Sequence, residues 1–470
     1  MREQSARVDL DPVERVVLVE NHDEAYRVWL NAGSVNKALV HVDAHHDMWW
    51  ADDASSLTIA NFISAALQSG LIREIHWVVP TATWQTASGR EAVARHVEKI
   101  VKQYPGERRP IRRAADSLAA CVHGTPLRVC SLGSLAVIDD DVLLDIDVDF
   151  LVIPRVSYGD VDEHSVEPWC WPDELVSRLG ARMVRANLAT IAYSVEGGYT
   201  PLEWKYLGDE LAARLGQPAS PAVVLAAKLM REGAQAVNLG DIAAAERSYS
   251  RAADVWPSSA APDFHLAHAY AGAGLLEDGR RMYRQAIAKD PSYRTPYSNA
   301  GFHRYWAGHV VDAEREFQRT LTLDAEHAGS LLGLAVVAAT QKRWADAETL
   351  LRRSLAADDE LVDTYRQFAV VLARRGADEE AICAYERSLA LAMAGHQPLG
   401  GLLGTRDDAV RLLDADHWKT HARLARLYER KGDVKRAIVG YRICVAAGHG
   451  GIALRRRLAR LCGEQETAAG

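Results

Sequence analysis

The sequence of 470 residues contains only six cysteines, and no two of them form a CxxC pair. Scattered thiols of this kind provide neither a zinc–cysteine site nor the dense cross-linking of a disulfide-stabilised domain. The sequence also has no apolar run long enough to cross a bilayer, and its opening stretch, MREQSARVDLDPVERVV, has no apolar core of the kind that a secretory signal requires. We therefore expect a cytoplasmic protein with reduced thiols and no membrane partner.

Charge is distributed unevenly along the chain. Residues 1–220 contain 21 Lys and Arg against 32 Asp and Glu, whereas residues 221–470 contain 34 against 31. An acidic half repels nucleic acid and attracts cations, either metal ions or a cationic substrate. Together with the length, this asymmetry predicts at least two domains with different tasks and no nucleic-acid partner, and it leaves the oligomeric state open.

Apolar runs alternate with amphipathic stretches in the first half of the chain. Six runs are predicted to be buried strands, at 16–21, 38–44, 75–80, 127–132, 142–151 and 190–196. Helical patterns lie between several of them, at 22–33, 58–70 and 90–104. This alternation predicts an α/β domain with a mostly parallel sheet covered on both faces, in which functional residues gather at the carboxyl ends of the strands.

A repeat of 34 residues follows the break GQPASP at 216–221. An aromatic residue or leucine recurs at that spacing, with a small residue four positions earlier and, in most copies, a glycine five positions before the small residue. The aromatic or leucine positions are Tyr249, Tyr283, Phe317, Leu351 and Tyr385. The period and these positions resemble the tetratricopeptide repeat family. We expect domains at 1–218 and 219–470, the second an all-α solenoid of about six repeats plus a capping helix, with extra residues around 396–410 before the last repeat.

Polar groups follow four of the predicted strands, where a buried strand would not favour them. They are His22, then Asp43, His45 and Asp47 in HVDAHHD, then Asp145, Asp147 and Asp149 in DIDVD, and Glu196 in SVEGG. Carboxylates converging at one sheet edge repel one another unless a cation neutralises them, and oxygen and nitrogen ligands favour hard or borderline divalent ions. The alternative is that these acids are solvated or cap helices.

These motifs resemble the superfamily of arginases, agmatinases and deacetylases, whose fold is a three-layer α/β/α sandwich. Its ureohydrolases hold two manganese ions with Asp-Ala-His-x-Asp and Ser-Phe-Asp-Val-Asp; DAHHD matches the first, and DIDVD matches the second with Asp145 replacing Ser. The resemblance implies two Mn²⁺ ions, or other divalent metals, bridged by Asp43 and Asp147. It further implies that His22 and Asp47 complete the ligand set of one ion and that His45 and Asp149 complete the ligand set of the other. Asp145 would support the ligands from behind.

Within the superfamily the sequence most resembles the peptide arginases, through ENHDEA (20–25), HVDAHHD (41–47), IANFI (59–63), LDIDVDFL (144–151) and SVEGGYTPLEW (194–204). This implies hydrolysis of peptidyl arginine to ornithine and urea in a ribosomally made precursor. Glu196 is then the catalytic carboxylate that positions the guanidinium beside Asp43, and Asn61 is a further substrate contact. Enzymes for free arginine carry a His after the first motif, and MWWADDASSLTIAN has none. The alternatives are another ureohydrolase or deacetylase, and an inactive scaffold.

The repeats predict a groove for an extended peptide. Groove positions on the first helix of each repeat are aromatic at one end and basic at the other, at Phe264, Phe302, Tyr305, Trp306, Arg366 and Arg374. Such a surface suits a peptide with apolar and acidic residues. We expect it to bind the leader of the precursor peptide, the alternative being a general protein-docking or dimerisation surface.

Overall fold

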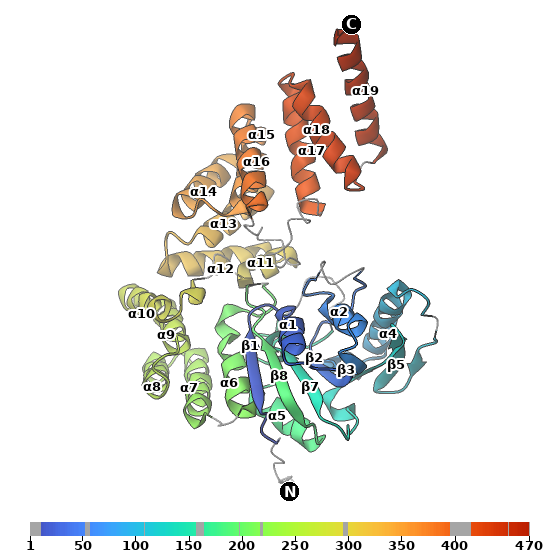
Figure 1. Cartoon of the computed structure of the whole chain (residues 1–470). Coiled ribbons are helices and arrows are strands. Elements are labelled where there is room, and N and C mark those ends of the chain that lie inside the picture. Colours follow the sequence, from blue (N-terminus) through green and yellow to red (C-terminus); the bar gives the residue numbers. More distant parts are fainter. Residues whose placement is uncertain are drawn as a thin grey trace. The chain divides into compact units, whose positions relative to one another are not determined.

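The computed structural model describes residues 11–51, 57–107, 109–156, 164–196, 198–216, 220–294, 299–394, 415–449 and 451–469 (Figure 1). The chain divides into two compact units. The first contains Met1–Thr295 and Phe302–His309, and the second contains Pro296–Gly301 and Val310–Gly470. The first unit holds the sheet together with the first four helices of the repeat region. No described helix is both long and apolar enough to cross a membrane.

An eight-stranded sheet forms the centre of the first unit, in the order β1-β8-β7-β2-β3-β6-β5-β4. The neighbouring strands β1, β8, β7, β2, β3 and β6 pair in parallel, whereas β5 pairs antiparallel with both β6 and β4. The predicted parallel sheet is therefore mixed. Its strands are β1 (Arg15–Val19), β2 (Lys37–Val42), β3 (Ile72–Val78), β4 (Arg112–Arg113), β5 (Ser117–Val122), β6 (Thr125–Cys130), β7 (Val142–Asp147) and β8 (Ala186–Ala192).

Helices cover the sheet because their apolar faces need a partner. One core joins Trp29 of α1 (Glu24–Asn31), Phe62 of α2 (Phe62–Gln68) and Val97 of α4 (Ala87–Gln103) to strand residues such as Leu39 and Leu143. The crossovers from β1 to β2, from β2 to β3 and from β3 to β6 all advance toward the β4 edge, whereas the crossover from β7 to β8 advances toward β1. Because such crossovers are right-handed, α5 (Pro172–Ala181) is expected on the face opposite to α1, α2 and α4. The short α3 (Ala82–Gln85) precedes α4, and α6 (Tyr206–Leu215) packs against β1 and β8.

The remaining helices follow in consecutive pairs, with α19 last. They are α7 (Pro221–Asn238), α8 (Ile242–Val255), α9 (Ala261–Gly272), α10 (Leu276–Lys289), α11 (Asn299–Trp306), α12 (Val310–Leu323), α13 (Ala328–Thr340), α14 (Trp344–Ala357), α15 (Val362–Arg375), α16 (Asp378–Met393), α17 (Ala415–Arg430), α18 (Val434–Ala446) and α19 (Ile452–Ala469). The proposed boundary at residue 218 and the extra residues at 396–410 lie outside the described residues.

The residues that define the 34-residue period form the contacts between paired helices. Tyr249, Phe317 and Leu351 are buried on the second helices of their pairs. A Cβ added at Gly233 of α7 would lie 2.6 Å from the ring of Tyr249, so the small residue permits the close approach of the two helices. The turn glycines have positive φ, as at Gly240 (75°), where a left-handed residue ends the first helix.

Contacts inside the first unit connect α6 to the first repeat helices. Arg231 of α7 places its guanidinium Nη2 2.6 Å from a carboxylate oxygen of Glu210, which is fully buried on α6. The same guanidinium lies 2.9 Å from Asp173 and over the ring of Trp171, with 4.3 Å to the ring centroid. A buried carboxylate of the α/β part is thus neutralised by a residue of the repeat region.

Candidate metal centre

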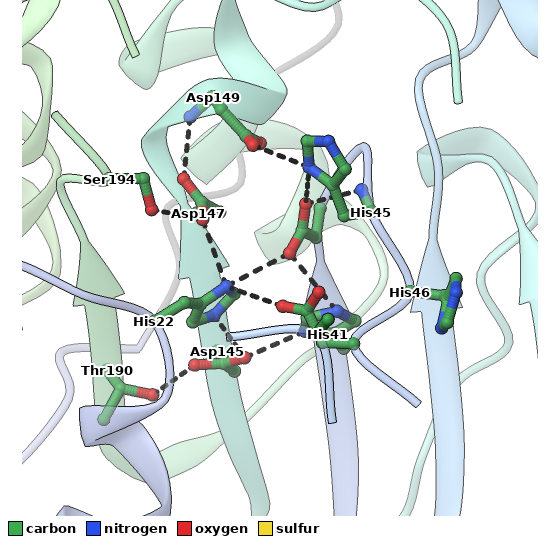
Figure 2. Close-up of polar contacts among 12 residues, drawn as sticks. His22, His41, His45, His46, Asp145, Asp147, Asp149, Thr190 and Ser194 are labelled. Carbon is green, nitrogen blue, oxygen red and sulfur yellow. Dashed lines mark hydrogen bonds and ion pairs between the residues drawn. The ribbon is translucent and has the colours of Figure 1, made fainter. Parts of the chain in front are cut away.

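Four neighbouring strands bring the predicted polar residues to one edge of the sheet. β1, β8, β7 and β2 are adjacent in that order, although they lie far apart in the sequence. His22 follows β1, Asp43 follows β2, and Asp147 ends β7. Figure 2 shows the side chains of His22, His45, Asp147 and Asp149 pointing toward one another. The structure therefore brings the predicted residues into one cluster.

His22 lies at the centre of a first ligand group. Its Nδ1 atom is 3.1 Å from Oδ2 of Asp43, 3.1 Å from Oδ2 of Asp47 and 3.1 Å from Oδ2 of Asp147. All four residues are buried. One imidazole nitrogen and three carboxylate oxygens thus face a common point.

A second group shares Asp43 with the first. Nδ1 of His45 lies 2.8 Å from Oδ2 of Asp149 and 3.4 Å from Oδ1 of Asp43. Oδ2 of Asp43 faces His22, so each oxygen of this carboxylate serves one group. The sets His22–Asp43–Asp147 and Asp43–His45–Asp149 each have ligand atoms within 4.8 Å of one another. Two adjacent ions sharing Asp43 fit this arrangement.

Buried polar atoms without hydrogen-bond partners provide the test of that fit. Among the described residues, Nδ1 of His22, Oδ2 of Asp43 and both carboxylate oxygens of Asp149 form no contact with hydrogen-bond geometry, although Oδ2 of Asp43 and Oδ2 of Asp149 lie at ion-pair distance from an imidazole. Buried polar atoms without hydrogen bonds are costly, and divalent cations in the two groups would satisfy them. Since every atom is oxygen or imidazole nitrogen, the donor set suits Mn²⁺ and similar ions.

Asp145, which the resemblance to ureohydrolases implies as a support behind the ligands, contacts the cluster from below. Its Oδ2 is 2.8 Å from Nε2 of His22 and 2.8 Å from Nδ1 of His41, and its Oδ1 accepts a hydrogen bond of 2.5 Å from Thr190. The contact to Nε2 leaves Nδ1 of His22 directed at the proposed ion. A carboxylate behind a ligand imidazole fixes the ring orientation.

Sequence reasoning missed four residues that hold this cluster. His41 and Thr190 are fully buried within β2 and β8, and both contact Asp145. Ser194 donates a hydrogen bond of 2.6 Å to Oδ2 of Asp147, and Glu20 accepts hydrogen bonds from the backbone N–H of Val195 and of Glu196. A polar residue inside an otherwise apolar strand was the available signal for His41 and Thr190.

Asp43, His45 and Asp47 alternate in HVDAHHD as side chains on one face of an extended strand would, but none of the three lies in a strand. β2 ends at Val42, and the chain then turns, with the backbone N–H of His45 donating to Oδ1 of Asp43 at 2.6 Å. Asp47 has a φ of 51°, and Ser194 has a φ of 53°. Left-handed backbone is uncommon outside glycine and clusters at functional sites, and here it directs ligand and support residues inward.

The protonation behaviour reflects burial and the density of carboxylates. Burial and then the carboxylate of Asp43 raise the pKa of Asp47 to about 6, and burial and Asp147 raise the pKa of Asp149 well above its ordinary value. Burial opposes the charged form of Asp145 too, yet His22 and His41 lower its pKa to about 2. The cluster thus holds protons that a bound cation would displace.

In the described part of the chain, His46 of the HVDAHHD motif, and Asn61 and Glu196, which the sequence predicts to contact the substrate, belong to neither ligand group. His46 is directed away from it (Figure 2), accepts from the backbone N–H of Met48 at 2.8 Å and packs against Trp49. Asn61 is buried just before α2, and its carbonyl oxygen accepts from the backbone N–H of Thr58 at 2.7 Å. Glu196 is exposed in the loop after β8.

The predicted groove residues differ in exposure. Phe264 and Phe302 are buried, and Phe264 packs against Tyr293. Tyr305 is half-buried, whereas Trp306 is 37% exposed. In the second unit, Arg374 is exposed and Arg366 forms an ion pair with Asp363.

Comparisons with known proteins concern the repeats. The tetratricopeptide repeat model matches residues 231–294 and 304–361. Among solved structures, the chain is similar to PilF of Pseudomonas aeruginosa at 17% identity and a TM-score of 0.30, over 51% of this chain and 99% of that one. It is similar to YrrB, a TPR protein with an unusual peptide-binding site, at 17% identity and a TM-score of 0.28, over 45% and 97%. No curated protein matches. Residues 231–294 and 304–361 therefore carry tetratricopeptide repeats.

Proposed function

We propose that the α/β part is a binuclear metal-dependent hydrolase that converts peptidyl arginine to peptidyl ornithine and urea, while the repeats bind the peptide. The observation that carries this proposal is the buried ligand set at the ends of β1, β7 and β2, in which Asp43 presents one oxygen to each of two groups. The likeness of its motifs to those of peptide arginases supports the substrate.

Two divalent ions would be held by the predicted residues, with Asp43 between them. His22 and Asp47 would belong to one group and His45 and Asp149 to the other, while Asp147, proposed as the second shared ligand, has one oxygen beside His22 and the other at the backbone N–H of Asp149. Divalent ions held by these residues, with Mn²⁺ as the proposed metal, would supply a water of lowered pKa as the nucleophile for guanidine hydrolysis at neutral pH. The chain itself supplies the geometry, since Asp145 orients His22 and Ser194 orients Asp147.

The substrate guanidinium is a planar cation that stays protonated, so a carboxylate suits its recognition. We assign that role to Glu196, which is exposed beside the cluster. Its loop is fixed, because the backbone N–H of Glu196 donates to Oε1 of Glu20 at 2.8 Å. Asn61 is the second proposed substrate contact, and it also holds the turn at Thr58.

The test combines metal analysis with mass spectrometry. The full chain should bind about two Mn²⁺ ions and, with an arginine-containing peptide, produce a loss of about 42 Da per modified arginine, which corresponds to hydrolysis of the guanidino group. Asp43→Asn should abolish this loss, because Asp43 serves both ligand groups.

Asp116→Asn provides a matched control, since Asp116 is exposed and contacts Ser134 away from the cluster. It should leave metal content and product unchanged. If Asp43→Asn remained fully active, the proposed centre would be wrong. If the wild-type chain bound metal but released acetate from an acetylated substrate and left arginine intact, the chain would be a deacetylase, and if it bound no metal it would be a scaffold.

A further inference from the structure

Positive charge is concentrated in the last three helices. Residues 415–463 contain twelve Lys and Arg but only three Asp and Glu. Some of these cations are neutralised by α16, as Arg430 is by Asp378 and Lys431 by Glu379. The remaining ones determine what the surface can bind.

Basic residues follow one side of α17. Lys419, Arg423, Arg426 and Arg430 recur every third or fourth residue, which places them on the same helical face. Arg423 and Arg426 are exposed. Across the described part of the chain, no carboxylate forms an ion pair with either guanidinium. Two guanidinium groups are therefore available on this face.

A third guanidinium comes from α15. The helices α15 to α19 share one core, which contains Leu372, Tyr385 and Leu424. Burial raises the pKa of the Tyr385 phenol, and this rise is opposed by Arg423, which hydrogen-bonds to it, and by Arg374 nearby. Arg374 is exposed and, among the described residues, has no carboxylate partner. Arg374 and Arg423 thus lie near one phenol.

We propose that Arg374, Arg423 and Arg426, here called the arginine face, bind an acidic stretch of a peptide. Guanidinium groups bind carboxylates through paired hydrogen bonds, and guanidiniums of α15 and α17 that have no carboxylate partner among the described residues match carboxylates spaced along an extended chain. This inference deepens the peptide-binding half of the proposed function and is independent of hydrolysis.

A peptide fits this surface better than nucleic acid does. The remainder of the chain is acidic, with 32 Asp and Glu against 21 Lys and Arg in residues 1–220, and such a charge repels a long polyanion. The matched repeat family occupies the preceding helices, and repeats of this kind present surfaces to proteins and peptides. We therefore commit to an acidic peptide as the occupant.

Fluorescence anisotropy on the full chain without metal tests the inference. The probe is a labelled peptide of about ten residues, rich in Glu, and its control has Gln at each Glu position. The double variant R423Q/R426Q should weaken binding of the acidic peptide by about tenfold or more, because two charge-assisted contacts are lost. The double variant R455Q/R456Q removes the same charge from exposed positions of α19 and should change binding less than about threefold.

Circular dichroism first establishes that both variants are folded. If the two double variants weakened peptide binding equally, the attraction would be diffuse, and the proposal that the arginine face binds the peptide would be wrong. Equal binding of the Gln peptide, no binding of the Glu peptide, or tighter binding of a single-stranded oligonucleotide of the same charge would also overturn it. Because no metal is present, a failure of the hydrolase proposal leaves these outcomes unaffected, and the reverse also holds.

Discussion

Asp145 is the residue on which the orientation of His22 depends. Its carboxylate contacts His22, His41 and Thr190, all buried. Asp145→Asn keeps the size of the side chain but puts an amide N–H where one imidazole now donates. We expect the affinity for Mn²⁺ to fall by about 10–100-fold while the fold is kept, which is the usual effect of replacing a residue that hydrogen-bonds to a metal-binding histidine. Titration calorimetry measures this, and unchanged affinity would show that Asp145 does not act through His22.

The cluster also predicts how pH acts on the metal-free protein. The raised pKa values of Asp47, about 6, and of Asp149 mean that the folded state binds more protons than the unfolded state as pH rises from about 4, so stability falls across this window. His22 acts in the same direction, because Asp145 and Asp147 raise its pKa despite burial, and its contribution is lost as pH rises. The low pKa of Asp145 takes effect only below this window.

The cluster therefore lowers the urea midpoint near pH 7.5 relative to pH 5 in EDTA, and it acts against His46 and His96, whose pKa values burial lowers. Added Mn²⁺ should raise the midpoint more at about pH 7.5. In Asp47→Asn the metal-free difference should shrink. A stabilisation by Mn²⁺ that is the same at both pH values would contradict the proposed displacement of protons by metal.

At the scale of elements, the turns between paired helices differ in one repeat. Glycine takes the left-handed position at Gly308 and Gly376, with φ of 83° and 84°, whereas Lys342 takes it with φ of 61°. A side chain there costs about 1 kcal/mol, so Lys342→Gly should raise the free energy of unfolding by about that amount. Gly376→Ala should lower it similarly. Urea denaturation measures both, and destabilisation by Lys342→Gly would show that the lysine side chain has a packing role.

The strands show what sequence patterning can and cannot specify. Apolar runs located β1, β2, β3, β6, β7 and β8 to within a few residues, because buried parallel strands are continuously apolar. β5, SLAACV, was missed, since small and polar residues dilute its pattern. Neither the strand order nor the antiparallel edge can be read from periodicity, which carries no information on pairing partners.

The sequence likewise predicts part of the candidate metal centre but not the residues that support it. Acids and imidazoles directly after strands identified His22, Asp43 and Asp149, because parallel strands end at one sheet edge. His41 and Ser194 both fall within predicted strands, at 38–44 and 190–196, and their roles could not be predicted because these roles depend on residues brought near only by the fold.

At the scale of the whole molecule, the sheet and the first repeats lie in one compact unit, and we expect the two to unfold together. Arg231→Met removes a partner of Glu210, which is buried and then retains Arg214 at 2.7 Å. We expect a loss of about 2–3 kcal/mol, less than for a fully unpaired buried charge. Arg280→Met, which breaks a pair with the exposed Glu277, should cost under about 1 kcal/mol. Tryptophan fluorescence during urea unfolding checks both, and equal effects would contradict the proposed linkage.

The order of the sheet also bears on biosynthesis. In the folded protein Arg15 of β1 lies opposite Leu188 of β8, whereas the candidate ligands lie between His22 and Asp149. A nascent chain therefore exposes β1 and the motif that contains Asp43 long before β8, the strand between β1 and β7, emerges from the ribosome. Until then unpaired β1 offers an edge for wrong pairing, and an ion held by the proposed ligand set would bind late.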